Sequence, residues 1–348
     1  MTKLKKLLKR LGPGFITGAA DDDPSGIATY SQTGAMFGYS QLWTAFFSTP
    51  FMIVLQEMTG RIGIVTGKGL ASVLRENYSK KLLYFSVLIL LIANTINIGA
   101  DLGAMASSAQ LLLGLPFVFW LILITAFTLS LEIFVSYRNY AKFLKYMALS
   151  LLAYVITAFV IKQDWAEVFR TTFIPHITFT KDYFINIVAV LGTTISPYLF
   201  FWQADEEIED EIVKHKSKSI EMESPQKAKR DLKEMRWDTI TGMIFSNLIM
   251  FFIILTTAST LGQRGITNIA TASDAAQALQ PLAGQFTFLL FAIGILGVGL
   301  LAVPVLAGSA SYAMAEALGW KVGLYKKFGR AHGFYGIIAI ATLIGLLV

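Results

Sequence analysis

The sequence contains no cysteine, and only 15% of its 348 residues carry a charge. The absence of cysteine excludes disulfide bonds, a cysteine nucleophile, zinc–thiolate sites and iron–sulfur clusters. Soluble domains average about 25% charged residues, whereas here 55% of the residues are hydrophobic. The composition therefore excludes an ordinary soluble protein.

The few charged residues are separated by long charge-free runs. These runs cover 24–56, 82–100, 102–131, 183–204, 239–263, 275–315 and 331–348. Most of them reach the roughly 18 residues that an apolar helix needs to cross a bilayer. We therefore predict an all-α polytopic protein embedded in a lipid bilayer. The nine expected spans are 12–35, 41–66, 82–113, 116–137, 143–162, 183–204, 237–262, 285–316 and 331–348.

The basic residues predict how the chain is oriented. With the N-terminus in the cytoplasm, 25 of the 29 lysines and arginines fall on the cytoplasmic side of the nine spans. Such a bias is typical of cytoplasmic loops. We expect a bacterial inner-membrane or plasma-membrane protein with a cytoplasmic N-terminus. The net charge of +6 then reports orientation and does not indicate a nucleic-acid partner.

Residues 205–236 form the one long polar stretch. It opens with six acidic residues between Asp205 and Glu211 and closes with basic residues up to Arg236. We expect a charged, solvated cytoplasmic helix or linker; a regulatory metal-sensing segment is the alternative. Three other acids, Glu57, Glu132 and Glu316, lie near the ends of expected spans. Snorkelling to the membrane surface, or pairing with a nearby basic residue such as Lys321 for Glu316, would explain their presence there.

The first predicted span is interrupted by three aspartates, Asp21 to Asp23, followed by Pro24 and Ser25. A charge in hydrocarbon costs several kcal/mol unless it is paired or faces water. Proline ends the helix and frees backbone carbonyls beside the carboxylates. This combination predicts a cation site inside the membrane. The alternative is that the aspartates only cap a helix at the membrane interface.

A second interruption falls in the sixth span, where Thr193, Thr194 and Ser196 precede Pro197. The hydroxyl groups could line a site or simply cover carbonyls that the proline frees. Interrupted spans at matching places in two halves indicate a transporter of inverted repeats, with the substrate held at mid-membrane. We predict repeats at 1–165 and 183–348, the second of them incomplete with four spans.

Several motifs resemble one known family. The segments Gly12-Pro-Gly-Phe15, Asp23-Pro-Ser-Gly26, Gly38-Tyr-Ser-Gln-Leu-Trp43 and Arg61-Ile-Gly-Ile-Val-Thr-Gly-Lys68 are similar to the first two spans of the natural resistance-associated macrophage protein (NRAMP) family of divalent metal transporters. The resemblance implies a fold like that of the leucine transporter, LeuT. It also implies a metal site between spans one and six, with the metal ion as cargo and no cofactor.

The ligand motifs depart from those of the manganese and iron transporters of that family. Those members read Asp-Pro-Gly-Asn and Met-Pro-His, whereas this chain has Asp23-Pro-Ser-Gly26 and Ser196-Pro-Tyr198. The departures resemble the NRAMP-related magnesium transporters. A thioether favours softer metals, whereas carboxylate, carbonyl and hydroxyl oxygens with water suit magnesium. The expected metal-site residues are Asp23, Ser25, Gly26, Thr193, Ser196 and Gln203.

These residues lead us to expect transport of a divalent cation, magnesium first and manganese second, by alternating access. Gln203 and Ala104 occupy positions where proton-coupled relatives carry a histidine and an acid, so we expect no proton coupling. A proton-coupled manganese and iron symporter and a sodium-coupled amino-acid carrier of the same fold are alternatives. An intramembrane aspartyl protease using Asp23 and Asp101 is an alternative of another class.

Overall fold

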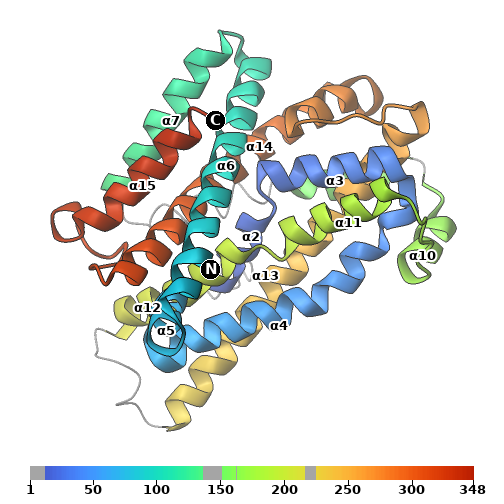
Figure 1. The fold of residues 1–348 in the computed structure, drawn as a ribbon. Helices are drawn as coiled ribbons and strands as arrows, with labels where there is room; N and C mark the ends of the chain where they lie inside the picture. Colours follow the sequence, from blue (N-terminus) through green and yellow to red (C-terminus); the bar gives the residue numbers. More distant parts are fainter. Residues whose placement is uncertain (1–11, 136–150, 162, 216–224) are drawn as a thin grey trace, which may run out of the picture.

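The computed structural model describes all residues except 1–11, 136–150, 162 and 216–224, and the described part is helical without strands (Figure 1). The α-helices are α2 (Pro13–Asp21), α3 (Pro24–Phe37), α4 (Trp43–Thr66), α5 (Leu70–Asn77), α6 (Lys80–Leu113), α7 (Phe117–Phe134), α9 (Leu152–Val160), α10 (Trp165–Phe173), α11 (Lys181–Thr194), α12 (Pro197–His215), α13 (Pro225–Thr260), α14 (Ala272–Leu318) and α15 (His332–Gly345). Short 3₁₀ helices are η1 (Gly38–Gln41), η4 (Gly262–Arg264) and η5 (Phe328–Arg330).

Both predicted helix interruptions are present. Asp22 and Asp23 link α2 to α3, and Asp23 has the extended backbone of a helix N-cap (φ −61°, ψ 165°). Ile195 and Ser196 link α11 to α12. In each case proline is the first residue of the second helix, because proline tolerates the first turn of a helix and disfavours helical backbone in the residue before it.

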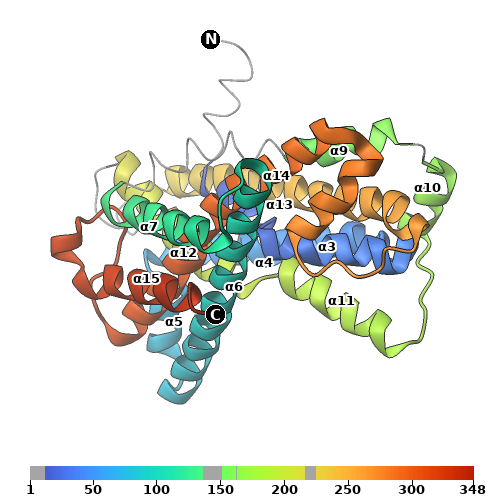
Figure 2. The same ribbon diagram turned by 90° about the horizontal axis from the view of Figure 1, so that it is seen from above.

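The two broken spans lie side by side. α2 packs against α12, and α3 packs against α11, as Figure 1 also shows. α13 runs along both α2 and α3, so it spans the first interruption. α6 packs against α14, and α15 packs against both of them and α7 (Figure 2). The interruptions are therefore enclosed by long unbroken helices.

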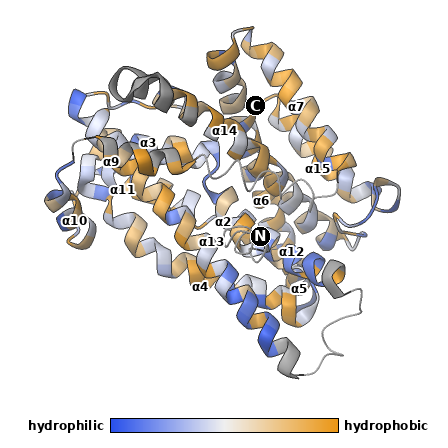
Figure 3. Cartoon of the chain, turned by 180° about the vertical axis from the view of Figure 1, so that it is seen from behind, coloured by the Kyte–Doolittle hydropathy of each residue, from blue (hydrophilic) through white to orange (hydrophobic). Residues whose placement is uncertain are grey.

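Five described helical segments are long and apolar enough to cross a membrane. They are Lys80–Leu113, Phe117–Phe134, Lys181–Ile212, Lys229–Arg264 and Phe291–Leu318. α15 is apolar but shorter. Large apolar side chains such as Phe51, Phe85 and Ile122 remain exposed, and Figure 3 shows the apolar residues spread over the outer helices. Such surfaces suit lipid contact. The count of nine spans stays a prediction, and residues 143–150 and 162 of the expected span 143–162 lie outside the described residues.

The described residues of 205–236 are helical, as one form of the expectation had it, but the expectation that this stretch is solvated is wrong for its first part. α12 continues unbroken from Pro197 through this stretch to His215, and α13 already begins at Pro225. The side chains of Asp205, Glu206 and Glu209 are buried. They are buried because the second half of α12 packs against α5 and α14.

The N-terminal end of α2 is fixed to α13 through hydrogen bonds and close backbone contact. The two carboxylate oxygens of Asp238 accept hydrogen bonds from the amides of Gly12 and Gly14, both at 2.8 Å. A Cβ atom on Gly18 would collide with the main chain of Gly242 in α13. Helices approach this closely only where small residues face each other.

We predict that Gly18→Ala lowers the thermal stability of the purified protein, because the added methyl group forces α2 and α13 apart. Overpacking of this kind typically costs 1 to 3 kcal/mol, roughly. The melting temperature is measured in detergent by heating samples and recording the remaining folded protein by size-exclusion chromatography. Gly336→Ala is the matched control, since a Cβ there meets no atom within 4 Å. Equal melting temperatures for the two variants would contradict the close contact.

Candidate metal site

Asp23 is the N-cap of α3 and is buried inside the protein. Its Oδ1 accepts hydrogen bonds from the Gly26 amide at 2.5 Å and from the Ser25 hydroxyl at 2.8 Å. Only 2% of Asp23 is exposed. The aspartate therefore does cap a helix, as one interpretation of the sequence expected. The cap lies in the middle of an interrupted span, where the positive end of the α3 dipole favours negative charge.

Gly26 leaves a small space that is surrounded by oxygen atoms. A Cβ built on Gly26 would lie 3.1 Å from Asp23 Oδ1, 3.2 Å from Thr193 Oγ1 and 3.3 Å from the Asp21 carbonyl oxygen. A carboxylate, a hydroxyl and a main-chain carbonyl from the two broken spans thus converge on one point. Oxygen ligands of these kinds are the ones that hard divalent cations prefer.

Asp101 of α6 also reaches the first interruption. Its Oδ1 accepts a hydrogen bond from the Ser25 amide at 3.2 Å. Its Oδ2 is buried and has no hydrogen-bond partner among the described residues. Asp101 is not among the metal-site residues expected from the sequence. The signal that could have included it was an acid isolated in the middle of a long apolar span.

Two further carboxyl groups are fully buried beside Asp23. Ser246 of α13 donates a hydrogen bond to Asp21 Oδ2 at 2.7 Å, whereas both oxygens of Asp22 lack a partner in the described part of the chain. No ion pair between described residues involves Asp21, Asp22 or Asp23. Buried carboxylates without basic partners require another source of positive charge, a proton or a metal cation.

Two of the polar side chains at the second interruption bond to main-chain carbonyls of α11. The Ser196 hydroxyl donates to the main-chain carbonyls of Gly192, at 3.0 Å, and Thr193, at 2.7 Å. The Thr194 hydroxyl donates to the Val190 carbonyl. These two hydroxyls cover carbonyls at the end of α11, as the alternative interpretation expected. Thr193 is the residue of this stretch whose hydroxyl faces the space at Gly26.

Gln203 lies outside this arrangement. Its side-chain amide donates to Glu207 Oε1 at 2.9 Å and to Thr239 Oγ1 at 3.2 Å, and its carbonyl accepts from Gln56 at 3.3 Å. Gln203 lies six positions after Pro197 in α12, about 9 Å along a helix. The structure therefore does not bring Gln203 together with the other expected ligands.

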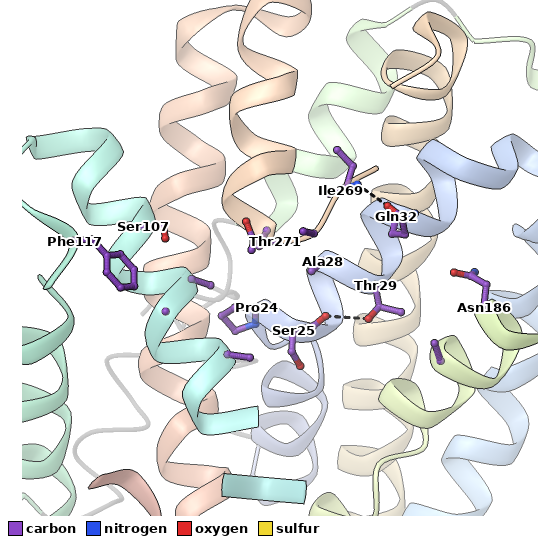
Figure 4. Close-up of a pocket in the computed structure, with 16 residues that line it drawn as sticks. Pro24, Ser25, Ala28, Thr29, Gln32, Ser107, Phe117, Asn186, Ile269 and Thr271 are labelled. Carbon is purple, nitrogen blue, oxygen red and sulfur yellow. Dashed lines mark hydrogen bonds between the residues drawn. The ribbon is translucent and has the colours of Figure 1, made fainter. Parts of the chain in front are cut away.

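A cavity of about 540 Å³ lies against the first interruption (Figure 4). Pro24 and Ser25 line one part of it, and the next turns of α3 contribute Thr29 and Gln32. The remaining lining comes from α6, α7, α11 and the segment before α14, and it contains no charged residue. The cavity is large enough for a hydrated ion, and it touches the residue that connects Asp23 with Asp101.

Among the described residues, no group of three or more aspartate, glutamate or histidine side chains could hold a metal ion. The oxygens at the interruption are instead two carboxylates, Asp23 and Asp101, both bonded to Ser25, together with a hydroxyl and a carbonyl. Mg²⁺ commonly binds through one or two carboxylates and keeps several waters. This donor set therefore suits an ion that stays partly hydrated.

Known proteins match both the sequence and the fold. The chain is 28% identical over 310 residues to the divalent metal cation transporter MntH of Caldanaerobacter subterraneus, covering 85% of this chain and 69% of that protein. It is 26% identical over 335 residues to the MntH of Deinococcus radiodurans, covering 92% of this chain and 72% of that protein.

Two solved structures share the fold. A manganese transporter of Eremococcus coleocola superposes with a TM-score of 0.75 at 17% identity, over 99% of this chain and 70% of that one. Mhp1, a nucleobase-cation-symport-1 family transporter, superposes with a TM-score of 0.62 at 14% identity, over 97% and 70%. The expected LeuT-like fold is confirmed.

The family model for natural resistance-associated macrophage protein-like (Nramp) proteins matches residues 14–348, from the first turn of α2 to the last residue of the chain. The match includes both interruptions and the residues that meet at Gly26. On this evidence, the chain belongs to the Nramp family.

Proposed function

We propose that the protein carries divalent metal cations across a membrane by alternating access. The observation that carries the proposal is the convergence of Asp23, Thr193 and the Asp21 carbonyl on the space at Gly26. Asp101, bonded to the Ser25 amide beside them, adds a second carboxylate. The names of the MntH relatives and of the manganese transporter with the same fold support this cargo.

We further propose magnesium as the first cargo and manganese as the second. The ligands we assign around the space at Gly26 are Asp23, the main-chain carbonyl of Asp21, Ser25, Thr193 and Asp101, with Ser196 as a selectivity position. Every donor in this set is an oxygen, and oxygen donors favour hard cations. The bacterial plasma membrane with a cytoplasmic N-terminus is the setting we propose.

A proton-coupled manganese symporter is the second candidate function. The observation that favours it is the buried Oδ2 of Asp101, which has no partner among the described residues and so could carry a proton. The manganese transporter of the same fold agrees with manganese as cargo. The sodium-coupled amino-acid carrier is disfavoured, because consecutive buried aspartates repel the carboxylate of an amino acid.

We predict that Asp23→Asn reduces uptake of Mg²⁺ and Mn²⁺ into proteoliposomes at least tenfold, roughly, because a neutral amide cannot offset the lost hydration of a divalent ion. Glu76→Gln is the matched control, since Glu76 is exposed and pairs only with Lys68 among the described residues. Uptake by Asp23→Asn at the level of this control would refute the assigned site.

We predict that Ser196→Met shifts selectivity from Mg²⁺ towards Mn²⁺ and Cd²⁺, because it introduces a soft thioether at the second interruption. Competition assays in proteoliposomes give the ratio of the Mg²⁺ and Cd²⁺ inhibition constants. An unchanged ratio in a variant that still transports would show that this position does not set selectivity.

We predict that cation entry proceeds without proton entry. Gln203 and Ala104 cannot titrate, and the membrane potential alone contributes about 4.6 kcal/mol per 100 mV for a divalent ion. Proteoliposomes that contain a pH-sensitive dye and receive a Mg²⁺ gradient test this expectation. Lumenal acidification in step with metal entry, absent from empty liposomes, would instead establish the symporter, with Asp101 as the first residue to examine.

A further inference from the structure

A second group of buried carboxylates lies away from the interruptions, where α12 and α14 meet the start of α5. Asp205 of α12 and Glu316 of α14 both lie over Gly69. A Cβ on Gly69 would collide with Asp205 Oδ1 and with Glu316 Oε1. These two oxygens are therefore at most 4.7 Å apart. We call Asp205 and Glu316 the inner acid pair.

The two members of the inner acid pair have different surroundings. Glu316 accepts hydrogen bonds from the amides of Gly69, at 3.2 Å, and Ser72, at 2.9 Å. Hydrogen bonds from backbone amides favour an ionised carboxylate. Asp205 is only 3% exposed, and its Oδ2 has no partner among the described residues. Its buried, unbonded oxygen lies beside a carboxylate that is held in place.

No basic side chain balances this charge in the described part of the chain. None of the ion pairs there involves Asp205 or Glu316, so the expected pairing of Glu316 with Lys321 is absent. The guanidinium group of Arg75 donates to the main-chain carbonyl of Glu316, at 2.7 Å, and not to its carboxylate. Two buried carboxylates this close together repel each other unless a proton or a metal cation lies between them.

The neighbouring acids add to the negative charge. Glu206 is 4% exposed, and its Oε1 lacks a partner among the residues described. Glu209 has a structural explanation, because its Oε1 accepts hydrogen bonds from the Tyr312 hydroxyl and the Leu324 amide. One shared proton would neutralise one charge among Asp205, Glu206 and Glu316, whereas a divalent cation would neutralise two.

We propose that the inner acid pair is a second binding site for a hard divalent cation. Asp205 lies eight positions after Pro197 in α12, about 12 Å along a helix, so this site is distinct from the one at Gly26. Two carboxylates completed by water are a common arrangement for Mg²⁺. The site lies at the polar end of α12, so under the proposed function it would hold the cation after it leaves the Gly26 site.

Metal stoichiometry tests the proposal, with Mn²⁺ as the probe. Free Mn²⁺ is measured by electron paramagnetic resonance during titration into the purified full chain in nanodiscs. We expect two bound ions for the unmodified protein and for Glu76→Gln. We expect one ion for Asp23→Asn, one for the combined Asp205→Asn and Glu316→Gln variant, and none when all three changes are combined.

The result separates the two proposals. A single ion that is lost in Asp23→Asn and unaffected by the paired substitution would overturn the inner site and leave the Gly26 site standing. A single ion that is lost only in the Asp205→Asn and Glu316→Gln variant would overturn the Gly26 site and leave the inner site standing. Substitution of both inner acids changes a buried part of the fold, so folding of the paired variant has to be checked. In size-exclusion chromatography it should elute as a single species at the same volume as Glu76→Gln.

A second measurement leaves the inner acid pair unchanged. Because the chain has no cysteine, Lys68→Cys gives one labelling position, next to Gly69 and on an exposed side chain. Mn²⁺ at the inner acid pair should strongly broaden the spectrum of a nitroxide at this position. The broadening should persist when Asp23→Asn is added. A spectrum that Mn²⁺ does not broaden would overturn the inner site.

Discussion

The structure depends on one constraint: a helix that stops inside a bilayer must have its free backbone groups bonded by the protein itself, because hydrocarbon supplies no partner. At each interruption, nearby side chains bond the free backbone groups. Asp23 accepts from the first turn of α3, and Ser196 donates to the carbonyls at the end of α11. These bonds place a carboxylate and carbonyl oxygens deep in an apolar environment, and that arrangement makes a cation site possible.

The sequence was sufficient to predict the features that arise from local chemistry. Pro24 and Pro197 fix both interruptions, and the expected spans 82–113 and 116–137 correspond to α6 and α7, with ends within a few residues of those expected. The motifs at the start of the chain led to the right family. Thr193 was named as a candidate, and its hydroxyl does face Gly26.

Features that depend on how distant helices pack could not be read from the chain. Gln203 was assigned by its position in a family motif, yet the rotation of α12 turns it towards Gln56 and Thr239. Asp101 was not expected in the metal site, because nothing in the sequence places it beside Ser25. The acids from Asp205 onwards read as a solvated segment, since polar composition alone does not reveal that α5 and α14 cover them.

α13 has a mechanical role that follows from its contacts. Asp238 bonds the start of α2, and Arg236 forms an ion pair with Glu57 of α4 at 3.2 Å. α2 and α4 are therefore both attached to α13, at positions within one turn of each other. Any rearrangement that opens the protein at this end must either carry α2, α4 and α13 together as one body or break these bonds first. A second conformation would show which of the two occurs, through the distances from Asp238 to Gly12 and from Arg236 to Glu57.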